Sequence, residues 1–184
     1  MDEAFIKKVQ PNSPEAEKSV IGSMLMDRDA IIEVADVLVK EDFYQNTNGI
    51  LYEAMVELYR EGKPVDLITL QNKLKEKQVP ESIQSLDYIR ELVEAVPTSA
   101  NAKQYAGIVR EKSILRKLIK VTEKITADCY LGKDEFSTIL EETEKDVFHL
   151  LQNASGREDF VPIRDVVLNT LDQIEEASKN KGKI

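Results

Sequence analysis

The sequence predicts an all-α chain. Three observations support this fold class: apolar residues recur at spacings of three and four, helix-capping residues stand before these segments, and runs of strict apolar–polar alternation are absent. Only 7 Gly and 6 Pro occur in 184 residues, so few positions interrupt a helix. We expect a compact multi-helix region, a protruding helical hairpin, a linker and one amphipathic helix.

The first half of the chain is expected to form five helices around one core. Ser13 precedes Pro14, and these residues are typical of an N-cap and a first helical position. They predict a helix over 14–26. Four further helices are expected: one capped by Asp29, one within 41–62, one over 66–77 and one over 86–96.

The Gly62-Lys63 pair resembles the end of a phosphate-binding loop, but its surroundings exclude one. Such a loop requires G-x-x-x-x-G-K-[ST], whereas Glu57 stands five residues before Gly62 and Pro64 follows Lys63. The stretch is better explained as a connection between helices. Gly62 takes a left-handed position after one helix, and Asp66 caps the next with Thr69.

A long helix and a return helix are expected between Asn101 and Leu150. About thirty residues after Asn101 contain no proline, and their apolar residues fall on two opposite faces. Beyond Gly132 the apolar residues follow a 4-3-4-3 spacing, typical of a seam between two helices. Folding back at Gly132 closes a hairpin with Cys129 in its apolar interior. The predicted seam includes Leu118, Val121, Phe136, Leu140 and Val147.

The opposite face of the long helix needs a different partner, either the compact region or another chain. We assign it to self-association through Tyr105, Ile108, Val109 and Leu115. After the hairpin, a polar linker precedes an amphipathic helix that is too short to be stable alone. Its docking face comprises Ile163, Val167, Leu171 and Ile174. The expected parts are 1–98, 99–153, 154–162 and 163–184.

The sequence offers no catalytic constellation, and no cofactor or metal site is expected. The single histidine, His149, and the single cysteine, Cys129, have no partners at metal-ligand spacing. One cysteine and no signal peptide indicate a reducing compartment, the cytoplasm. The net charge of −9 argues against a nucleic-acid-binding protein. A basic segment from Arg110 to Lys124 leaves that role open, the alternative being a solvated helix face.

Five segments in order resemble the N-terminal part of bacterial DnaB-type replicative DNA helicases. They are "PNSPEAEKSVIGSMLMD", "DFYQNTNGILYEAM", "EGKPVDLITL", "VPTSANAKQYAGIVREKSILRKLI" and "ETEKDVF". The resemblance spans the chain from about Pro11 to Ile184. Asn48 departs from it, since the family often has His there.

The resemblance implies a non-enzymatic assembly and primase-docking domain, with the final helix leading to a RecA-like motor beyond Ile184. ATP and Mg would bind only to that motor. Family members form hexameric rings in which hairpins pair neighbouring N-terminal domains into a collar. The linker helix docks on the motor of the adjacent subunit, and primase binds the collar. A helicase loader is a possible further partner, DNA would be contacted only by the full ring, and no membrane is involved. The alternative is a freestanding helical adaptor without a motor.

A docking surface for the helical C-terminal domain of primase should combine apolar anchors with a polar group outside the core. Ile119 and Ile125 lie toward the far end of the long helix, and Tyr88 lies at the margin of its helix's apolar stripe. Glu15 is expected to be solvated at a helix start. We therefore assign primase binding to Glu15, Tyr88, Ile119 and Ile125.

Overall fold

A computed structural model describes residues 9–132 and 135–154. Over these ranges the chain is helical and contains no strand, which confirms the predicted fold class. The helices are α1 (Pro14–Met26), α2 (Arg28–Val37), α3 (Asn46–Arg60), α4 (Leu67–Glu76), α5 (Glu81–Gln84), α6 (Leu86–Glu94), α7 (Ala102–Leu131) and α8 (Phe136–Ala154), with short 3₁₀ turns η1 (Lys40–Asp42) and η2 (Ser99–Asn101).

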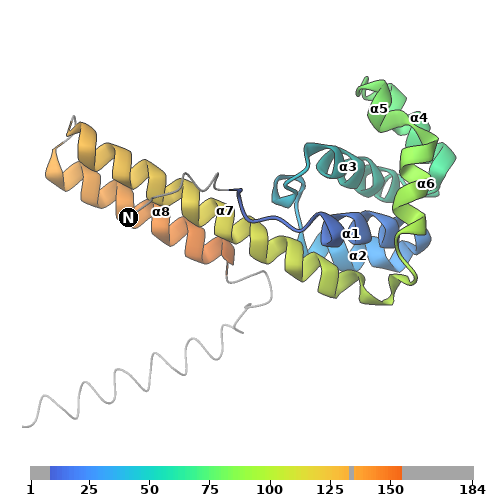
Figure 1. Cartoon of the computed structure of the whole chain (residues 1–184), viewed down its shortest axis with the longest axis horizontal. Coiled ribbons are helices and arrows are strands. Elements are labelled where there is room, and N and C mark those ends of the chain that lie inside the picture. The colour runs from blue at the N-terminus through green and yellow to red at the C-terminus, as the bar shows by residue number, and fades with distance from the viewer. Residues whose placement is uncertain (1–8, 133–134, 155–184) are drawn as a thin grey trace, which may run out of the picture. The chain divides into compact units, whose positions relative to one another are not determined.

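Helices α1 to α6 and the first half of α7 form one packed body, called the head below. Helix α1 lies at its centre and contacts α2, α3, α6 and α7 (Figure 1). Val20, Ile21 and Met24 of α1 are buried in the core. The other helices add fully buried side chains to it: Ile31, Leu51, Met55, Leu70, Leu74, Ile89 and Leu92.

Most predicted helix ends are confirmed by their hydrogen bonds. The Ser13 side chain accepts from the Ala16 N–H, and the Asp66 carboxylate accepts from the Thr69 N–H at 2.9 Å. Gly62 has φ +70°, and the Lys63 N–H donates to the Leu58 carbonyl, so α3 ends as predicted.

Two predictions of local structure were wrong. Asp27, not Asp29, caps α2, and its carboxylate accepts from the Asp29 N–H at 2.9 Å. The helix therefore starts immediately after α1, because one extended residue is enough to turn the chain. No helix was expected between 77 and 86, but the polar stretch after Pro80 forms the short helix α5 and buries Ile83.

Helix α7 leaves the head and forms a hairpin with α8. Its four buried residues, Ala102, Ala106, Val109 and Ser113, recur at helical spacing in its first half. Gly132 ends the helix in a left-handed conformation with φ +56°. Helix α8 then runs back along the second half of α7 (Figure 1), so the predicted hairpin forms.

By internal contacts the chain divides into Met1–Ala154 and Ser155–Ile184. The second unit, with the predicted docking face of Ile163, Val167, Leu171 and Ile174, lies outside the described residues. The boundary between head and hairpin stays a prediction, because α7 runs through both without a break.

Candidate functional site

The hairpin exposes large apolar side chains on one flank. Phe136 is 77%, Leu140 52% and Val147 40% exposed on α8, and Leu118 is 41% exposed on α7. The helical period places the three α8 residues within about 40° of one another. In two antiparallel helices, residues at the same rotation angle from the seam, counted along each helix, lie on the same side of the pair. Leu118 therefore lies on the same flank of the hairpin as the three α8 residues. We call these four residues the open face.

The seam of the hairpin is rotated by about 50°, or about half a residue, from the predicted one. The α8 residues turned toward α7 are Ile139, Thr143, Asp146 and Leu150, of which Leu150 is buried. Of the five predicted seam residues, only Val121 is half-buried there, and the other four form the open face. Lys124 pairs with Asp146 at 2.8 Å across the two helices, which fits the observed register.

Cys129 is exposed near the hairpin tip, so its interpretation as an apolar interior residue was wrong. Two of the four residues assigned to self-association belong to the chain's own core instead. Val109 is buried, and Tyr105 packs against the core while remaining half-buried. Only Ile108 and Leu115 stay exposed on that side of α7. The open face is therefore the larger apolar surface available for a partner.

A buried carboxylate, Asp42, ties α7 to the head. The Asp42 side chain is fully buried and accepts hydrogen bonds from the Ser113 hydroxyl and the Lys117 ammonium, both at 2.7 Å. The Arg110 guanidinium contacts both of its carboxylate oxygens, at 3.0 and 3.1 Å. The N–H of Val39, the residue before η1, also donates to it at 3.0 Å. Asp42 thus joins α7 to the turn between α2 and α3.

The pKa of the Asp42 carboxyl is lowered. Burial alone would raise this pKa, but hydrogen bonds from Lys117, Ser113 and the Val39 N–H, together with the charge of Arg110, outweigh it. The carboxylate is therefore ionised in the folded chain at neutral pH. Asp42 was not predicted from the sequence. A signal was present, because the polar residues Ser113 and Lys117 follow the buried residues of α7 at helical spacing, which indicates a polar partner at that position.

A second buried carboxylate, Glu17 of α1, organises the start of α3. It accepts from the backbone N–H groups of Tyr44 and Gln45 and from the Asn48 amide. The side-chain amide oxygen of Asn48, Oδ1, in turn accepts from the Tyr88 hydroxyl at 3.4 Å. Tyr88 is half-buried, and mainly this burial raises the pKa of its phenol. Tyr88 is thus linked to α1 and α3 through polar groups.

The other residues assigned to primase binding lie on α1 and α7. Glu15 is exposed in the first turn of α1, and Ile119 and Ile125 are half-buried on the second half of α7. The Arg116 guanidinium donates to the Pro11 carbonyl at 2.7 Å, which brings the segment before α1 close to the turn of α7 that precedes Ile119. The four residues come from three elements, α1, α6 and α7, and Ile125 lies on the hairpin part of α7, twelve residues beyond its last buried residue, Ser113.

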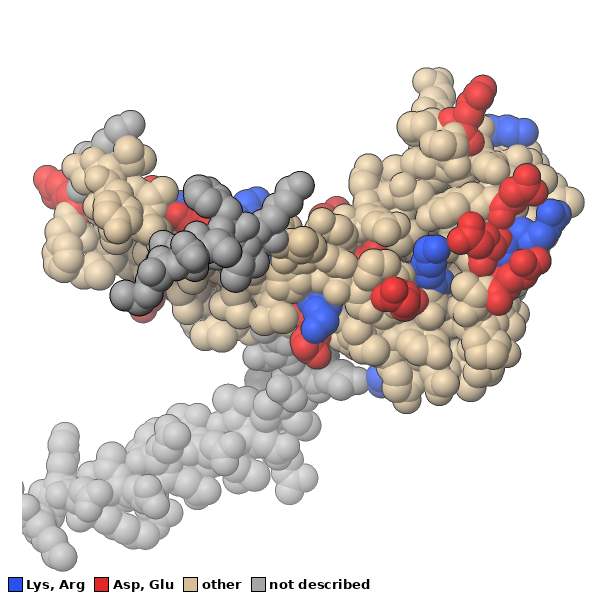
Figure 2. Space-filling view, viewed as in Figure 1, with Lys and Arg blue, Asp and Glu red and all other residues tan. Residues whose placement is uncertain are grey.

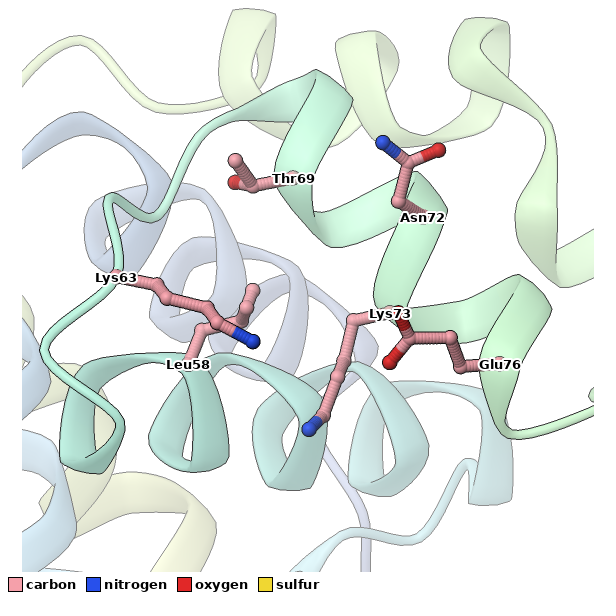
Figure 3. A pocket seen from close by; sticks show the side chains of 6 residues that line it. All are labelled: Leu58, Lys63, Thr69, Asn72, Lys73 and Glu76. Carbon is pink, nitrogen blue, oxygen red and sulfur yellow. The ribbon is translucent and has the colours of Figure 1, made fainter.

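The Gly62-Lys63 stretch borders a pocket of about 170 Å³ between α3 and α4 (Figure 3). Lys63 and Lys73 both face it, but both form ion pairs with Glu61. The Lys63 N–H is bonded to the Leu58 carbonyl. Hence this loop does not present the free backbone donors that a phosphate-binding loop needs.

Most of the Arg and Lys side chains between Arg110 and Lys124 form hydrogen bonds or ion pairs within the chain. Besides Arg110 and Lys117, Arg116 donates to the carbonyls of Asp42 and Pro11, and Lys124 pairs with Glu142 and Asp146. On the described part of the face in Figure 2, Lys and Arg atoms lie next to Asp and Glu atoms and form no broad basic surface. The segment serves as an internal anchor, and nothing here favours it as a nucleic-acid surface.

Over the described residues, no helix is long and apolar enough to cross a membrane. The same part of the chain contains no group of three or more His, Cys, Asp or Glu side chains placed to hold a metal ion. The features that stand out are the open face, the Asp42 anchor and the polar network at Tyr88. All three concern packing and contact rather than bond-making chemistry.

Comparison with known proteins gives a consistent result. Residues 9–111 match the family model of the DnaB-like helicase N terminal domain. The chain is 36% identical over its whole length to the replicative DNA helicase DnaB of Geobacillus stearothermophilus, but it spans only 40% of that protein. It is also 35% identical to the replicative DNA helicase DnaC of Bacillus subtilis, again over 40% of the relative.

Solved structures agree with these matches. The crystal structure of the N-terminal domain of DnaB helicase from Mycobacterium tuberculosis is similar with a TM-score of 0.74 and 31% identity, covering 77% of this chain and 99% of that one. The N-terminal domain of DnaB helicase from Helicobacter pylori, described with its interactions with primase, gives 0.54 and 27% identity, covering 63% and 90%.

Proposed function

The chain belongs to the family of DnaB-like helicase N-terminal domains, and we propose that it is the assembly and primase-docking domain of a bacterial replicative helicase. The observation that carries this proposal is the alignment of the whole chain with helicases of which it spans only 40%. In such a protein the motor that hydrolyses ATP with Mg would lie outside this chain. The protein would act in the cytoplasm, within a hexameric ring built from dimers.

The assembly part of the proposal is supported by the open face. Burying a large apolar side chain contributes about 1.5–3 kcal/mol. Phe136, Leu140, Val147 and Leu118 are exposed together on one flank, and such a surface on a folded domain is typical of a protein contact. A second hairpin, which carries the same face, would cover it with two-fold symmetry.

The primase part is supported by the Helicobacter pylori relative, whose N-terminal domain was described with its interactions with primase. This chain offers half-buried apolar side chains at Tyr88, Ile119 and Ile125, with the Glu15 carboxylate exposed at a helix start. Side chains of this kind can gain further burial when a helical partner docks. A helicase loader remains a further expected partner.

The test is a calorimetric titration of the helical C-terminal domain of the cognate primase into the chain. We expect saturable binding that Tyr88→Ala and Ile119→Asp each weaken by about fivefold or more, because truncating an anchor at a contact costs about 1 kcal/mol or more. Glu15→Ala should have a smaller effect, since its carboxylate is exposed.

The matched control is Tyr130→Ala, which removes an 88% exposed ring at the hairpin tip and is expected to leave affinity unchanged. Undiminished binding by all three folded variants would refute the assigned surface. Absence of binding by the unmodified chain would refute primase docking itself. The alternative of a freestanding adaptor is decided by the coding sequence after Ile184, where a helicase requires G-x-x-x-x-G-K-[ST].

A further inference from the structure

Polar contacts hold α7 at the point where it leaves the head. The last buried residue of α7 is Ser113. From Lys117 onward, over the described part of the helix, its side chains are half-buried or exposed. Apolar packing of α7 in the head core therefore ends with Val109, and the next two turns are attached through Arg110, Ser113, Arg116 and Lys117.

These four side chains converge on one residue. Arg110, Ser113 and Lys117 contact the Asp42 carboxylate, and Arg116 donates to the Asp42 backbone carbonyl at 2.6 Å. The second bond of Arg116 goes to the Pro11 carbonyl at 2.7 Å. The Arg116 guanidinium also lies over the Tyr44 ring, 5.7 Å from its centroid. Two turns of α7 are thus connected to η1 and to the segments beside it.

Contacts of this kind fix a direction better than apolar packing does. Burial of apolar surface is non-directional, whereas charge-assisted hydrogen bonds require defined distances and angles. The Asp42 carboxylate is fully buried, so water does not compete for its oxygens. In the hairpin, α7 packs on α8, which follows it in the chain.

A small change in the direction of α7 at these contacts would produce a larger displacement at the tip of the hairpin. Cys129 follows Lys117 by twelve residues, or about 18 Å along a helix. A tilt of about 10° at Lys117 would displace Cys129 by about 3 Å. Since Phe136 and Leu140 lie on the return helix at the same end, this end of the open face would move by a similar amount, whereas Leu118, next to Lys117, would hardly move.

We propose that Asp42 is a positioning residue, whose contacts with Arg110, Ser113, Arg116 and Lys117 set the direction in which the hairpin leaves the head. The consequence for assembly rests on the proposed function: a hairpin held in one direction presents its open face to a neighbouring copy without a further ordering cost. The direction of the hairpin relative to the head is a property of a single chain.

The test is a spin-label distance measurement between the head and the hairpin tip. Cys129 is the chain's only cysteine and is exposed, so it takes one label directly. A second label is introduced at Lys75→Cys, an exposed position of α4. Labelled protein is diluted with unlabelled protein, so that only distances within one chain are measured. The variants are Asp42→Asn and Lys117→Met, and the control is Lys120→Met, an exposed lysine one turn further on.

We expect a narrow distance distribution for the unmodified chain and for Lys120→Met. Asp42→Asn and Lys117→Met should broaden or shift it by about 3 Å, the displacement expected from a tilt of about 10°. Lys117→Arg keeps the charge and should restore the narrow distribution. If Asp42→Asn does not fold, Lys117→Met decides, because the Lys117 side chain is 40% exposed and its loss leaves the core intact.

A distribution in folded Lys117→Met that equals that of the unmodified chain would overturn the proposal. The result is independent of assembly, which sedimentation reports separately. A chain that stays monomeric would contradict the proposed assembly role, while the distance distribution would still decide whether Asp42 positions the hairpin.

Discussion

Asp42→Asn is expected to lower the free energy of unfolding by about 3 kcal/mol, the effect of breaking a buried ion pair by removing one partner. The substitution preserves the shape of the side chain but removes the charge that faces Lys117 and Arg110 at 2.7 and 3.0 Å. It also places an amide N–H₂ among donors, where an acceptor is needed. Urea denaturation followed by circular dichroism at pH 7 measures the loss.

The control for this prediction is Asp87→Asn. Asp87 is 93% exposed and pairs with Arg90 one turn away, so its loss should cost less than about 1 kcal/mol. An Asp42→Asn variant as stable as Asp87→Asn would show that the buried cluster contributes no net stability, and the anchoring role would fail with it.

Acid should remove the difference between the unmodified chain and Asp42→Asn. The pKa of Asp42 is lowered in the folded chain from an unfolded value of about 3.9. Its contribution to stability is therefore fully present above about pH 4 and is lost as the pH falls through the folded-state pKa. We expect the gap between the two urea midpoints to be constant from pH 7 to 5 and to narrow toward pH 3.

Gly22→Ala is expected to destabilise the head by about 2–3 kcal/mol, although alanine is the better helix former. A Cβ at this position would lie 2.3 Å from the Leu92 carbonyl oxygen and 2.6 Å from Cγ2 of Val96. The first of these atoms belongs to the backbone of α6, so relief requires α6 to move away from α1. Such a shift would disturb the packing of Leu92 and Ile89, which are fully buried.

Gly107→Ala provides the matched control in a second helix. Apart from its neighbours and the backbone of its own helix, no atom of the described residues lies within 4 Å of a Cβ built at Gly107, and the residue is exposed on α7. The substitution should stabilise the chain by about 0.5–1 kcal/mol through helix propensity alone. The two variants are thus expected to change the thermal midpoint in opposite directions, and a stabilised Gly22→Ala would contradict the close packing of α1 on α6.

Local signals in the sequence were sufficient to predict the helices of the head. Ser13 before Pro14, Gly62 after α3 and Asp66 with Thr69 each act within a few residues, and the structure forms all three caps. The misplaced start of α2 has the same local origin, because Asp27 and Asp29 are both capping residues and only one extended residue separates α1 from α2.

The rotation of the hairpin and the Asp42 cluster could not be predicted in the same way. The predicted 4-3-4-3 series that starts at Phe136 also passes through Thr143 and Leu150, and both of these residues are turned toward α7 in the observed seam. The spacing alone therefore does not decide between the two seams. The ion pair of Lys124 and Asp146 fits the observed register and involves no apolar residue. Asp42 meets its partners across about seventy positions of sequence, and nothing near Asp42 in the chain indicates a buried charge.

Sedimentation equilibrium over a wide range of protein concentration measures whether this chain is an assembly domain. We expect association that increases with concentration and is weakened by Leu140→Glu, which places a charge on the open face. Ile68→Glu, at an isoleucine of α4 that is 68% exposed, should associate like the unmodified chain. A monomer at every concentration, or a Leu140→Glu variant that associates as strongly as the unmodified chain, would contradict assembly through the open face.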